Sequence, residues 1–339
     1  MKALTLNRLL WICGSLLAVL FVVVVVALKV GAVPISIADL AVNLGRVILG
    51  RGAQVPAEYR FIVFDLRLPR IFLAILVGGA LSVSGTSFQA LLRNPLADPY
   101  VLGISSGGAV GAIVGRIFAP QLPLVAPLTA FLGASATIAA VYFLGRRKGQ
   151  LDSTTLLLAG IISASFLSAV ISFLVTTLAG RDLRGIVFWL MGDLSTPLPD
   201  ALHWVLLAGL IVGVGAIYTT AGDLNVITAG EREALHLGVD VTRVKLVVYV
   251  SASLLTGLAV SVSGAIGYVG LLVPHAMRML FGSDYRVLIP TSLIGGAIAL
   301  VAADTLARTV MKPTELPVGA VTAILGAPFF IYLLRRRLP

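Results

Sequence analysis

Charged residues and cysteines are scarce in this chain. Only 12% of its 339 residues are Asp, Glu, Lys or Arg, whereas a soluble domain carries roughly 25%. Hydrophobic residues make up 58% and the mean hydropathy is +1.04. This composition excludes a soluble globular protein and predicts an all-α polytopic membrane protein. The single cysteine, Cys13, lies inside the first apolar run, so the chain cannot form an internal disulfide.

The chain also lacks the motifs of several functional classes. It has no Gly-x-x-x-x-Gly-Lys-Ser/Thr sequence, and none of its five lysines follows a glycine, so it has no phosphate-binding loop of its own. Its three histidines (His203, His236 and His275) form no ligand-spaced cluster with acids, which argues against a catalytic metal. The net charge of +10 does not indicate nucleic-acid binding, because the arginines lie in loops between apolar runs. We therefore expect neither a bound cofactor nor an enzymatic activity.

Ten apolar runs predict about ten transmembrane helices. Lys2 and Arg8 precede the first run, residues 9–28, which is too long for a typical signal-peptide core and is expected to stay as a helix with a cytoplasmic amino terminus. Even-numbered spans then end in the cytoplasm, where the positive-inside rule places most basic loops and the carboxyl terminus. The other runs are residues 71–92, 101–118, 124–144, 154–178, 202–218, 244–266, 269–281, 287–310 and 318–334.

One nine-residue pattern occurs twice. Residues 77–85 in the second run resemble residues 256–264 in the seventh run, and five spans of separation give the two copies opposite orientations. An inverted repeat is the usual architecture of a transporter, although small residues at these positions also allow close helix packing. We expect one membrane domain over residues 1–339, with repeats at about 67–218 and 244–335.

The least hydrophobic interior stretch lies between the two predicted repeats, at about residues 223–243. It is expected to form a short helix that breaks at Gly238, followed by a second helix capped by Asp240. A membrane protein that exposes such a helix to the cytosol offers a contact for a soluble partner. We interpret this stretch as the contact with an energy-supplying subunit.

Several residues allow two interpretations from the sequence. Gly103, Gly107 and Gly111 are typical either of a broken helix that lines a pathway or of a packing face. Arginines on the outer side could contact lipid headgroups, form salt bridges or bind an acidic partner protein. Asp304 and Arg308 are spaced i, i+4, which favours an intrahelical ion pair over an ion-coupling site.

A series of ordered motifs resembles the FecCD family from about residue 60 to the carboxyl terminus. The family comprises permease subunits of type II ABC importers for ferric siderophores, haem and vitamin B12. The motifs are Arg-Leu-Pro-Arg at 67–70, Gln-Ala-Leu-Leu-Arg-Asn-Pro-Leu-Ala-Asp-Pro at 89–99 followed by Leu-Gly at 102–103, Leu-Leu-Leu-Ala-Gly at 156–160, Gly-Leu-Leu-Val-Pro-His at 270–275, and Glu-Leu-Pro-Val-Gly-Ala-Val-Thr-Ala-Ile-Leu-Gly-Ala-Pro at 315–328.

The resemblance implies a homodimeric permease in the bacterial inner membrane, with both termini in the cytoplasm. It also implies two cytoplasmic ATP-binding cassette subunits, which hold ATP and Mg, and a periplasmic substrate-binding protein. Three sets of residues match family positions. They are the ATPase-coupling residues Glu231, Ala234, Leu235 and Gly238; the binding-protein docking residues Arg67, Arg70 and Arg308; and the cytoplasmic gate residues Asn94, Leu96, Ser153 and Thr154.

Two other interpretations stay open from the residues alone. Ser153 and Thr154 could simply cap a helix. An ion-coupled secondary transporter would also show inverted repeats, and it would need a buried carboxylate, for which Asp304 is the candidate. A membrane scaffold that carries no ligand is a third class.

Overall fold

The computed structural model describes residues 5–31, 33–147, 150–178, 183–311 and 314–337 as a nearly all-helical bundle. Each predicted apolar run coincides with a helix in the described chain. These helices are α1 (Leu6–Lys29), α4 (Leu68–Leu91), α5 (Ile104–Phe118), α6 (Val125–Leu144), α7 (Ser153–Leu178), α9 (Asp200–Thr219), α12 (Val241–Ser263), α13 (Val269–Phe281), α14 (Tyr285–Ala307) and α15 (Val318–Arg337).

The remaining elements are short. They are α2 (Ile37–Ile48), η1 (Gly52–Gln54), α3 (Ala57–Arg60), η2 (Phe61–Arg67), η3 (Pro99–Leu102), the hairpin strands β1 (Arg146–Arg147) and β2 (Gln150–Leu151), α8 (Leu183–Leu190), α10 (Ala221–Ala229) and α11 (Glu231–His236). In the described residues, seven helices are long and apolar enough to cross a membrane, whereas α5, α13 and part of α15 form shorter apolar helices. The count of ten spans therefore stays a prediction.

Helix α4 is the centre of the bundle, and its small residues allow its neighbours to approach closely. A Cβ atom on Gly78 would collide with the backbone of Gly296 in α14, and one on Gly85 would collide with Gly270 in α13. On the α12 side, Ser84 Oγ donates to the Ala252 carbonyl at 2.9 Å. Glycine at these sites lets backbones pack where a larger side chain would hold the helices apart.

The second span begins earlier than the sequence indicated. We expected the helix to start at about Ile71, but α3, η2 and α4 form one continuous helix over residues 57–91. Pro69 lacks an N–H and would normally interrupt a helix. The preceding π-helical turns, in which the Leu68 N–H donates to Val63 five residues back, allow the chain to continue through this proline.

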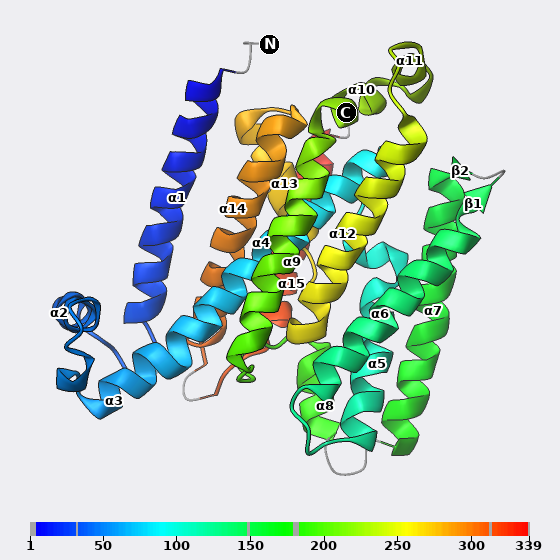
Figure 1. Cartoon of the computed structure of the whole chain (residues 1–339). Helices are drawn as coiled ribbons and strands as arrows, with labels where there is room; N and C mark the ends of the chain where they lie inside the picture. The colour runs from blue at the N-terminus through cyan, green and yellow to red at the C-terminus, as the bar shows by residue number, and fades with distance from the viewer. Residues whose placement is uncertain (1–4, 32, 148–149, 179–182, 312–313, 338–339) are drawn as a thin grey trace.

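The two copies of the nine-residue pattern lie on α4 and α12, which pack against each other and run antiparallel. The end of α4 and the start of α12 lie close together, because Glu231 forms ion pairs with both Arg93 and Lys245. Helix α11, the start of α1 and the end of α15 lie at this same end of the bundle (Figure 1). We call it the α11 end and the opposite one the Arg70 end. Antiparallel packing supports the predicted inverted repeat, whose boundaries stay a prediction.

The glycines of α5 form a packing face. A Cβ atom on Gly107 would lie 2.7 Å from the Gly133 carbonyl, and one on Gly111 would collide with the Thr129 carbonyl, both in α6. Gly103 takes φ +74 at the start of α5, a left-handed conformation that glycine adopts without steric cost. Of the two interpretations of this stretch, the structure therefore shows close packing.

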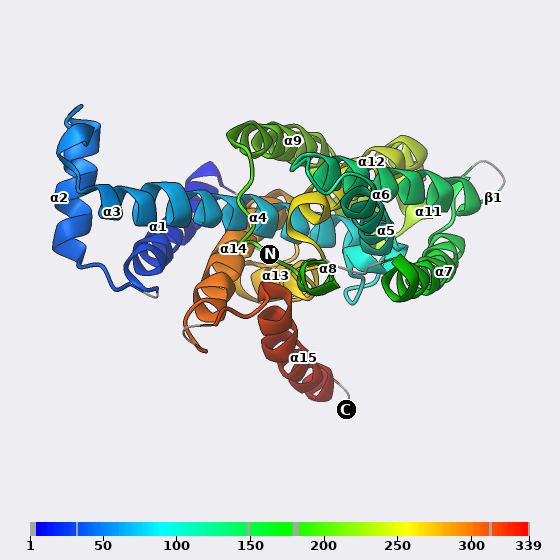
Figure 2. The same ribbon diagram turned by 90° about the horizontal axis from the view of Figure 1, so that it is seen from below.

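Helix α2 has the pattern of a helix at a membrane surface. Ile37, Ala41, Leu44 and Ile48 follow the i, i+4, i+7, i+11 spacing of one helical stripe, and all four are exposed. Figure 1 shows α2 end-on beyond the end of α1, and Figure 2 shows it along its length, so it lies crosswise to α1. An apolar stripe in this orientation fits the boundary between lipid headgroups and acyl chains.

Candidate functional site

The α11 end carries the short helix that the sequence predicted. Gly230 precedes α11, and Gly238 follows it with φ +82. The Val239 N–H donates to the Ala234 carbonyl and the Gly238 N–H to the Leu235 carbonyl, both at 3.0 Å, which is the hydrogen-bond pattern of a Schellman motif. This ending places residue 238 in a left-handed conformation, which glycine adopts at the least cost.

Four predicted coupling residues lie on or beside α11, but they face different ways. Leu235 is 60% exposed, whereas Ala234 is fully buried and supports the helix from beneath. Leu237, which the sequence did not indicate, is 72% exposed beside Leu235. Two neighbouring exposed leucines on a polar segment form an apolar contact surface that a soluble partner can cover. We call Leu235 and Leu237 the leucine pair.

Glu231 points into the molecule. Its carboxylate forms ion pairs with Arg93, just after α4, and with Lys245 of α12 at 2.7 Å. Burial alone would raise the pKa of Glu231. Hydrogen bonds and charges from Lys245 and Arg93 outweigh that effect and hold the pKa below its ordinary value. The carboxylate therefore stays charged at neutral pH.

The four predicted gate residues lie in two segments near the same end. The Asn94 side chain accepts from the Leu96 N–H at 2.9 Å and shapes the turn after α4, where Leu96 is exposed. Ser153 Oγ donates to the Leu91 carbonyl at 3.2 Å, which joins the start of α7 to the end of α4. Thr154 is exposed. Their role in a gate stays a prediction.

Helix capping does not explain Ser153 and Thr154. The carboxylate of Asp152 accepts from the Thr155 N–H at 2.8 Å and from its hydroxyl at 2.7 Å, so Asp152 supplies the cap of α7. The alternative left open from the sequence, that Ser153 and Thr154 cap the helix, placed the cap one or two residues too late. Aspartate is among the strongest capping residues, and its position before the helix was the signal that could have identified it.

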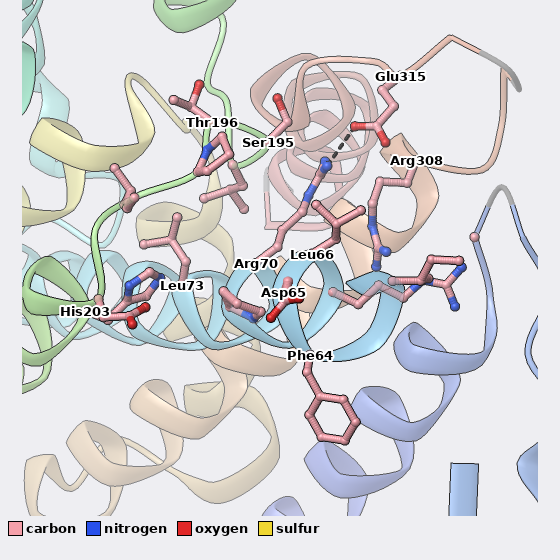
Figure 3. A pocket seen from close by; sticks show the side chains of 18 of the residues that line it. Phe64, Asp65, Leu66, Arg70, Leu73, Ser195, Thr196, His203, Arg308 and Glu315 are labelled. Carbon is pink, nitrogen blue, oxygen red and sulfur yellow. Dashed lines mark hydrogen bonds and ion pairs between the residues drawn. The ribbon is translucent and has the colours of Figure 1, made fainter. Parts of the chain in front are cut away.

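A cavity of about 660 Å³ opens at the Arg70 end. Figure 3 shows its walls, which come from η2, α4, α9, the loop before α9 and the loop before α15. The polar walls carry both signs of charge; their charged residues are Asp65, Arg67, Arg70, Asp200, Arg308 and Glu315. His203 also lines the cavity, and its ring stacks on Phe72 with a centroid distance of 6.1 Å. Within the described ranges, no group of three His, Cys, Asp or Glu side chains could hold a metal ion.

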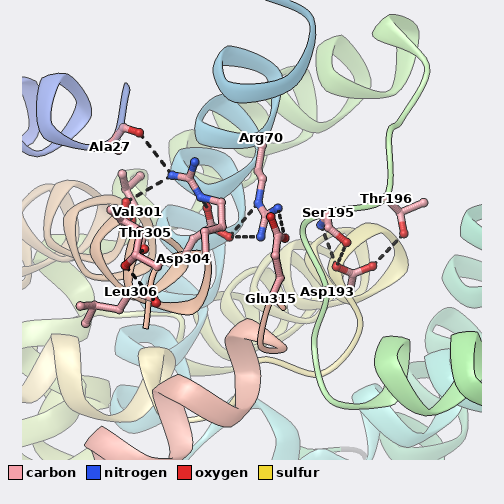
Figure 4. A network of polar contacts seen from close by, with 12 residues as sticks. Ala27, Arg70, Asp193, Ser195, Thr196, Val301, Asp304, Thr305, Leu306 and Glu315 are labelled. Atoms are coloured by element: carbon pink, nitrogen blue, oxygen red, sulfur yellow. Dashed lines mark hydrogen bonds and ion pairs between the residues drawn. The ribbon is translucent and has the colours of Figure 1, made fainter. Parts of the chain in front are cut away.

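Asp304 is the centre of an ion-pair network beside this cavity. Its side chain is 1% exposed and contacts Arg70 at 2.9 Å and Arg308 at 3.0 Å. Arg70 also reaches Glu315 at 2.7 Å (Figure 4), and Glu315 is 46% exposed. The intrahelical pair expected for Asp304 and Arg308 is thus present, and Arg70 extends it to a second helix. A carboxylate held by two guanidinium groups is poorly placed to bind and release a coupling ion.

Two of the three predicted docking arginines are buried in this conformation. Arg67 donates to the carbonyls of Leu28 and Val33, and Arg308 donates to the Ala27 carbonyl at 3.4 Å. Both guanidinium groups therefore hold the end of α1, and Arg67 also holds the loop that follows it. All three arginines line the cavity, but each already has internal partners. Their role in docking stays a prediction, and it requires a partner to compete for these contacts.

A comparison against models of known protein families identifies the chain. The model of the FecCD transport family matches residues 18–336, which is most of the chain. The chain belongs to the FecCD transport family. This result confirms the resemblance that the motifs indicated.

Named relatives of this FecCD chain transport different compounds. The cobalamin import system permease protein BtuC of Halobacterium salinarum is 44% identical over 287 residues, covering 84% of this chain and 76% of that protein. The hemin transport system permease protein HmuU of Yersinia pestis is 42% identical over 285 residues, covering 80% and 83%. A solved structure, described as an inward-facing conformation of a metal-chelate type ABC transporter, matches with a TM-score of 0.82 at 30% identity, covering 96% and 99%.

Proposed function

We propose that this FecCD chain is the permease subunit of an ATP-driven importer that moves a metal chelate into the cytoplasm by alternating access. The cargo is a ferric siderophore, haem or cobalamin. Two copies form the permease in the bacterial inner membrane. Two ATP-binding cassette subunits, which hold ATP and Mg, bind the α11 end, and a periplasmic binding protein docks at the Arg70 end.

The leucine pair at the end of α11 carries this proposal. The segment from Asp223 to Lys245 contains seven charged residues, and α10 and α11 lie beyond the ends of α9 and α12 (Figure 1). A protruding polar segment with an apolar contact surface can bind a soluble subunit and move with it. Nucleotide binding in that subunit can then shift the permease between two packings, provided that the subunit binds one packing more tightly.

Uptake into proteoliposomes tests the proposal. The permease and its ATPase are reconstituted with the binding protein outside, and ferric siderophore, haem and cobalamin are compared with ATP or ADP inside. We expect uptake of one class of chelate only with ATP and the binding protein. Uptake driven by a proton or sodium gradient without the ATPase would overturn the proposal.

Substitutions of Gly238 test the coupling assignment. Gly238→Ala and Gly238→Glu share the same backbone strain, about 1–2 kcal/mol, because both place a side chain at positive φ. Apart from the two neighbouring residues, no described part of the chain lies within 4 Å of the added Cβ, so neither substitution starts with a clash at this atom. We expect Gly238→Glu to lose ATPase binding or coupling, while Gly238→Ala retains most of it. Pull-down of the ATPase and ATP-driven uptake provide the measurement, and equal behaviour of the two variants would contradict the assignment.

The docking prediction needs a test that leaves the arginines intact. Charge reversal at Arg70 would also disrupt its ion pairs with Asp304 and Glu315. We therefore expect the affinity of the unaltered permease for its binding protein to fall as salt increases, because salt screens the attraction between opposite charges on two approaching proteins. Titration of the binding protein at several salt concentrations, with sucrose at matched osmolality as control, provides the measurement. An affinity independent of salt would exclude ionic docking.

A further inference from the structure

The network around Glu231 connects α11 to both predicted gate segments. Glu231 is the first residue of α11, and its Oε1 atom contacts both Arg93 Nη2 and Lys245 Nζ. These two cations belong to different parts of the bundle. Arg93 follows α4, whereas Lys245 lies in the first turns of α12. One carboxylate therefore joins three elements.

Arg93 leads directly into the first predicted gate segment. It precedes Asn94 and Leu96, and it adopts φ +47, a left-handed conformation that is uncommon for residues other than glycine. Such a conformation is kept where surrounding contacts require it. The ion pair with Glu231 is a contact of this kind, since it fixes the Arg93 side chain toward α11 while the backbone turns into the gate segment.

Lys245 leads to the second predicted gate segment. Its side chain is only 9% exposed, and its Nζ donates to the Leu151 carbonyl at 3.4 Å in addition to contacting Glu231. Leu151 is followed by Asp152, which caps α7, and then by Ser153 and Thr154. A buried ammonium depends on its counter-ion, so Lys245 and Glu231 are held together.

We infer that Glu231, Arg93 and Lys245 form a relay that transmits movement of α11 to residues 94–96 and residues 153–154 at the same time. The inference rests on the proposed function and adds positioning residues to it. Arg93 and Lys245 have no predicted role of their own, and Glu231 acts between α11 and the gate instead of contacting the ATPase. Because both cations share one carboxylate, a shift of α11 displaces both segments together.

Cysteine reporters can follow the two segments separately. Cys13 is the single native cysteine, so Cys13→Ser provides a cysteine-free background. Leu96→Cys and Thr154→Cys then place one reporter in each segment, both at exposed positions. The rate of maleimide labelling is measured in the assembled complex in nanodiscs, with ADP or with a non-hydrolysable ATP analogue. The difference between the two nucleotide states reports the movement of each segment.

The relay predicts a distinct pattern for three variants. Glu231→Gln is expected to abolish the nucleotide-dependent change at both reporters and to reduce ATP-driven uptake at least fivefold, the lower end of typical coupling between sites. Arg93→Gln should affect Leu96→Cys alone, and Lys245→Gln should affect Thr154→Cys alone. The ATPase should remain bound in all three. Glu233→Gln, an exposed substitution on the same helix, is the matched control and should behave as the parent.

Several outcomes would overturn the relay. If both reporters in Glu231→Gln keep the parent's difference in labelling rate between the two nucleotide states, transmission through this carboxylate is excluded. Loss of ATPase binding in that variant would make Glu231 a partner contact. Lys245 is buried, so Lys245→Gln could disrupt folding. Arg93 is more exposed, and Arg93→Gln therefore tests the relay even if the Lys245 variant does not fold. Failure of ATP-driven uptake in the unaltered protein would instead count against the proposed function.

Discussion

Replacing Asp304 with asparagine is expected to lower the free energy of unfolding by about 3–5 kcal/mol, the usual cost of removing one partner from a buried ion pair. Asp304 is almost completely buried and is the shared counter-ion of Arg70 and Arg308. Without its charge, Arg308 has only neutral acceptors, and Arg70 depends on the half-exposed Glu315. Thermal unfolding in detergent should show a clearly lower Tm and a smaller yield of folded protein.

Two further variants calibrate this result. Asp65→Asn removes an exposed carboxylate from the wall of the same cavity and should change stability by about 0.5 kcal/mol or less. Glu315→Gln breaks a partly exposed pair and should cost about 1 kcal/mol or less. A fully stable Asp304→Asn variant would show that the arginines do not need this counter-ion. The ion-coupling interpretation would then regain support if transport by that variant lost its dependence on an ion gradient.

The helices of the bundle could be predicted because hydropathy is a local property. The run expected at 124–144 is helix α6 over Val125–Leu144, and the run expected at 269–281 is α13 over the same residues. Even the shorter α5 and α13 were located correctly, since glycine and proline near their ends limit them. Such boundaries depend on neighbours in sequence, so no knowledge of packing was needed.

The extension of the α4 helix could not be predicted in the same way. Pro69 indicated a helix boundary, and residues 57–67 contain several charges. The π-helical turns of η2 resolve the conflict, and no local pattern specifies them. Likewise, the pairing of Arg70 with Asp304 joins residues 234 positions apart, so it follows from the packing of α4 on α14.

The candidate site shows the same division between local and distant information. The sequence located the short helix and its ending at Gly238, because both depend on residue type and spacing. It could not decide which side of α11 faces solvent. Ala234 and Leu235 are adjacent, so they point in different directions on the helix, and only Leu235 is exposed. Leu237 lies beyond the helix, where its exposure depends on how the chain turns into α12.

Replacing both members of the leucine pair with aspartate is expected to reduce ATP-driven uptake about 100-fold or more. Covering a leucine side chain contributes about 1.5–3 kcal/mol, and two such contributions correspond to at least two factors of ten in affinity for the ATPase. Leu235 and Leu237 are both largely exposed, so the permease itself should keep its stability. Pull-down of the ATPase and uptake into proteoliposomes measure the two effects.

The conservative double substitution to methionine separates apolar contact from side-chain identity. Leu235→Met with Leu237→Met keeps a similar apolar area at the same two positions, so ATPase binding and uptake should stay within about threefold of the parent, as is usual when hydrophobic volume is conserved. If the aspartate variant also binds the ATPase within threefold, the leucine pair is not the contact surface. If the methionine variant fails as completely as the aspartate variant, recognition depends on the shape of leucine, and the estimate from buried area is wrong. Strong loss with aspartate and retention with methionine would together show that the apolar surface of α11 holds the ATPase.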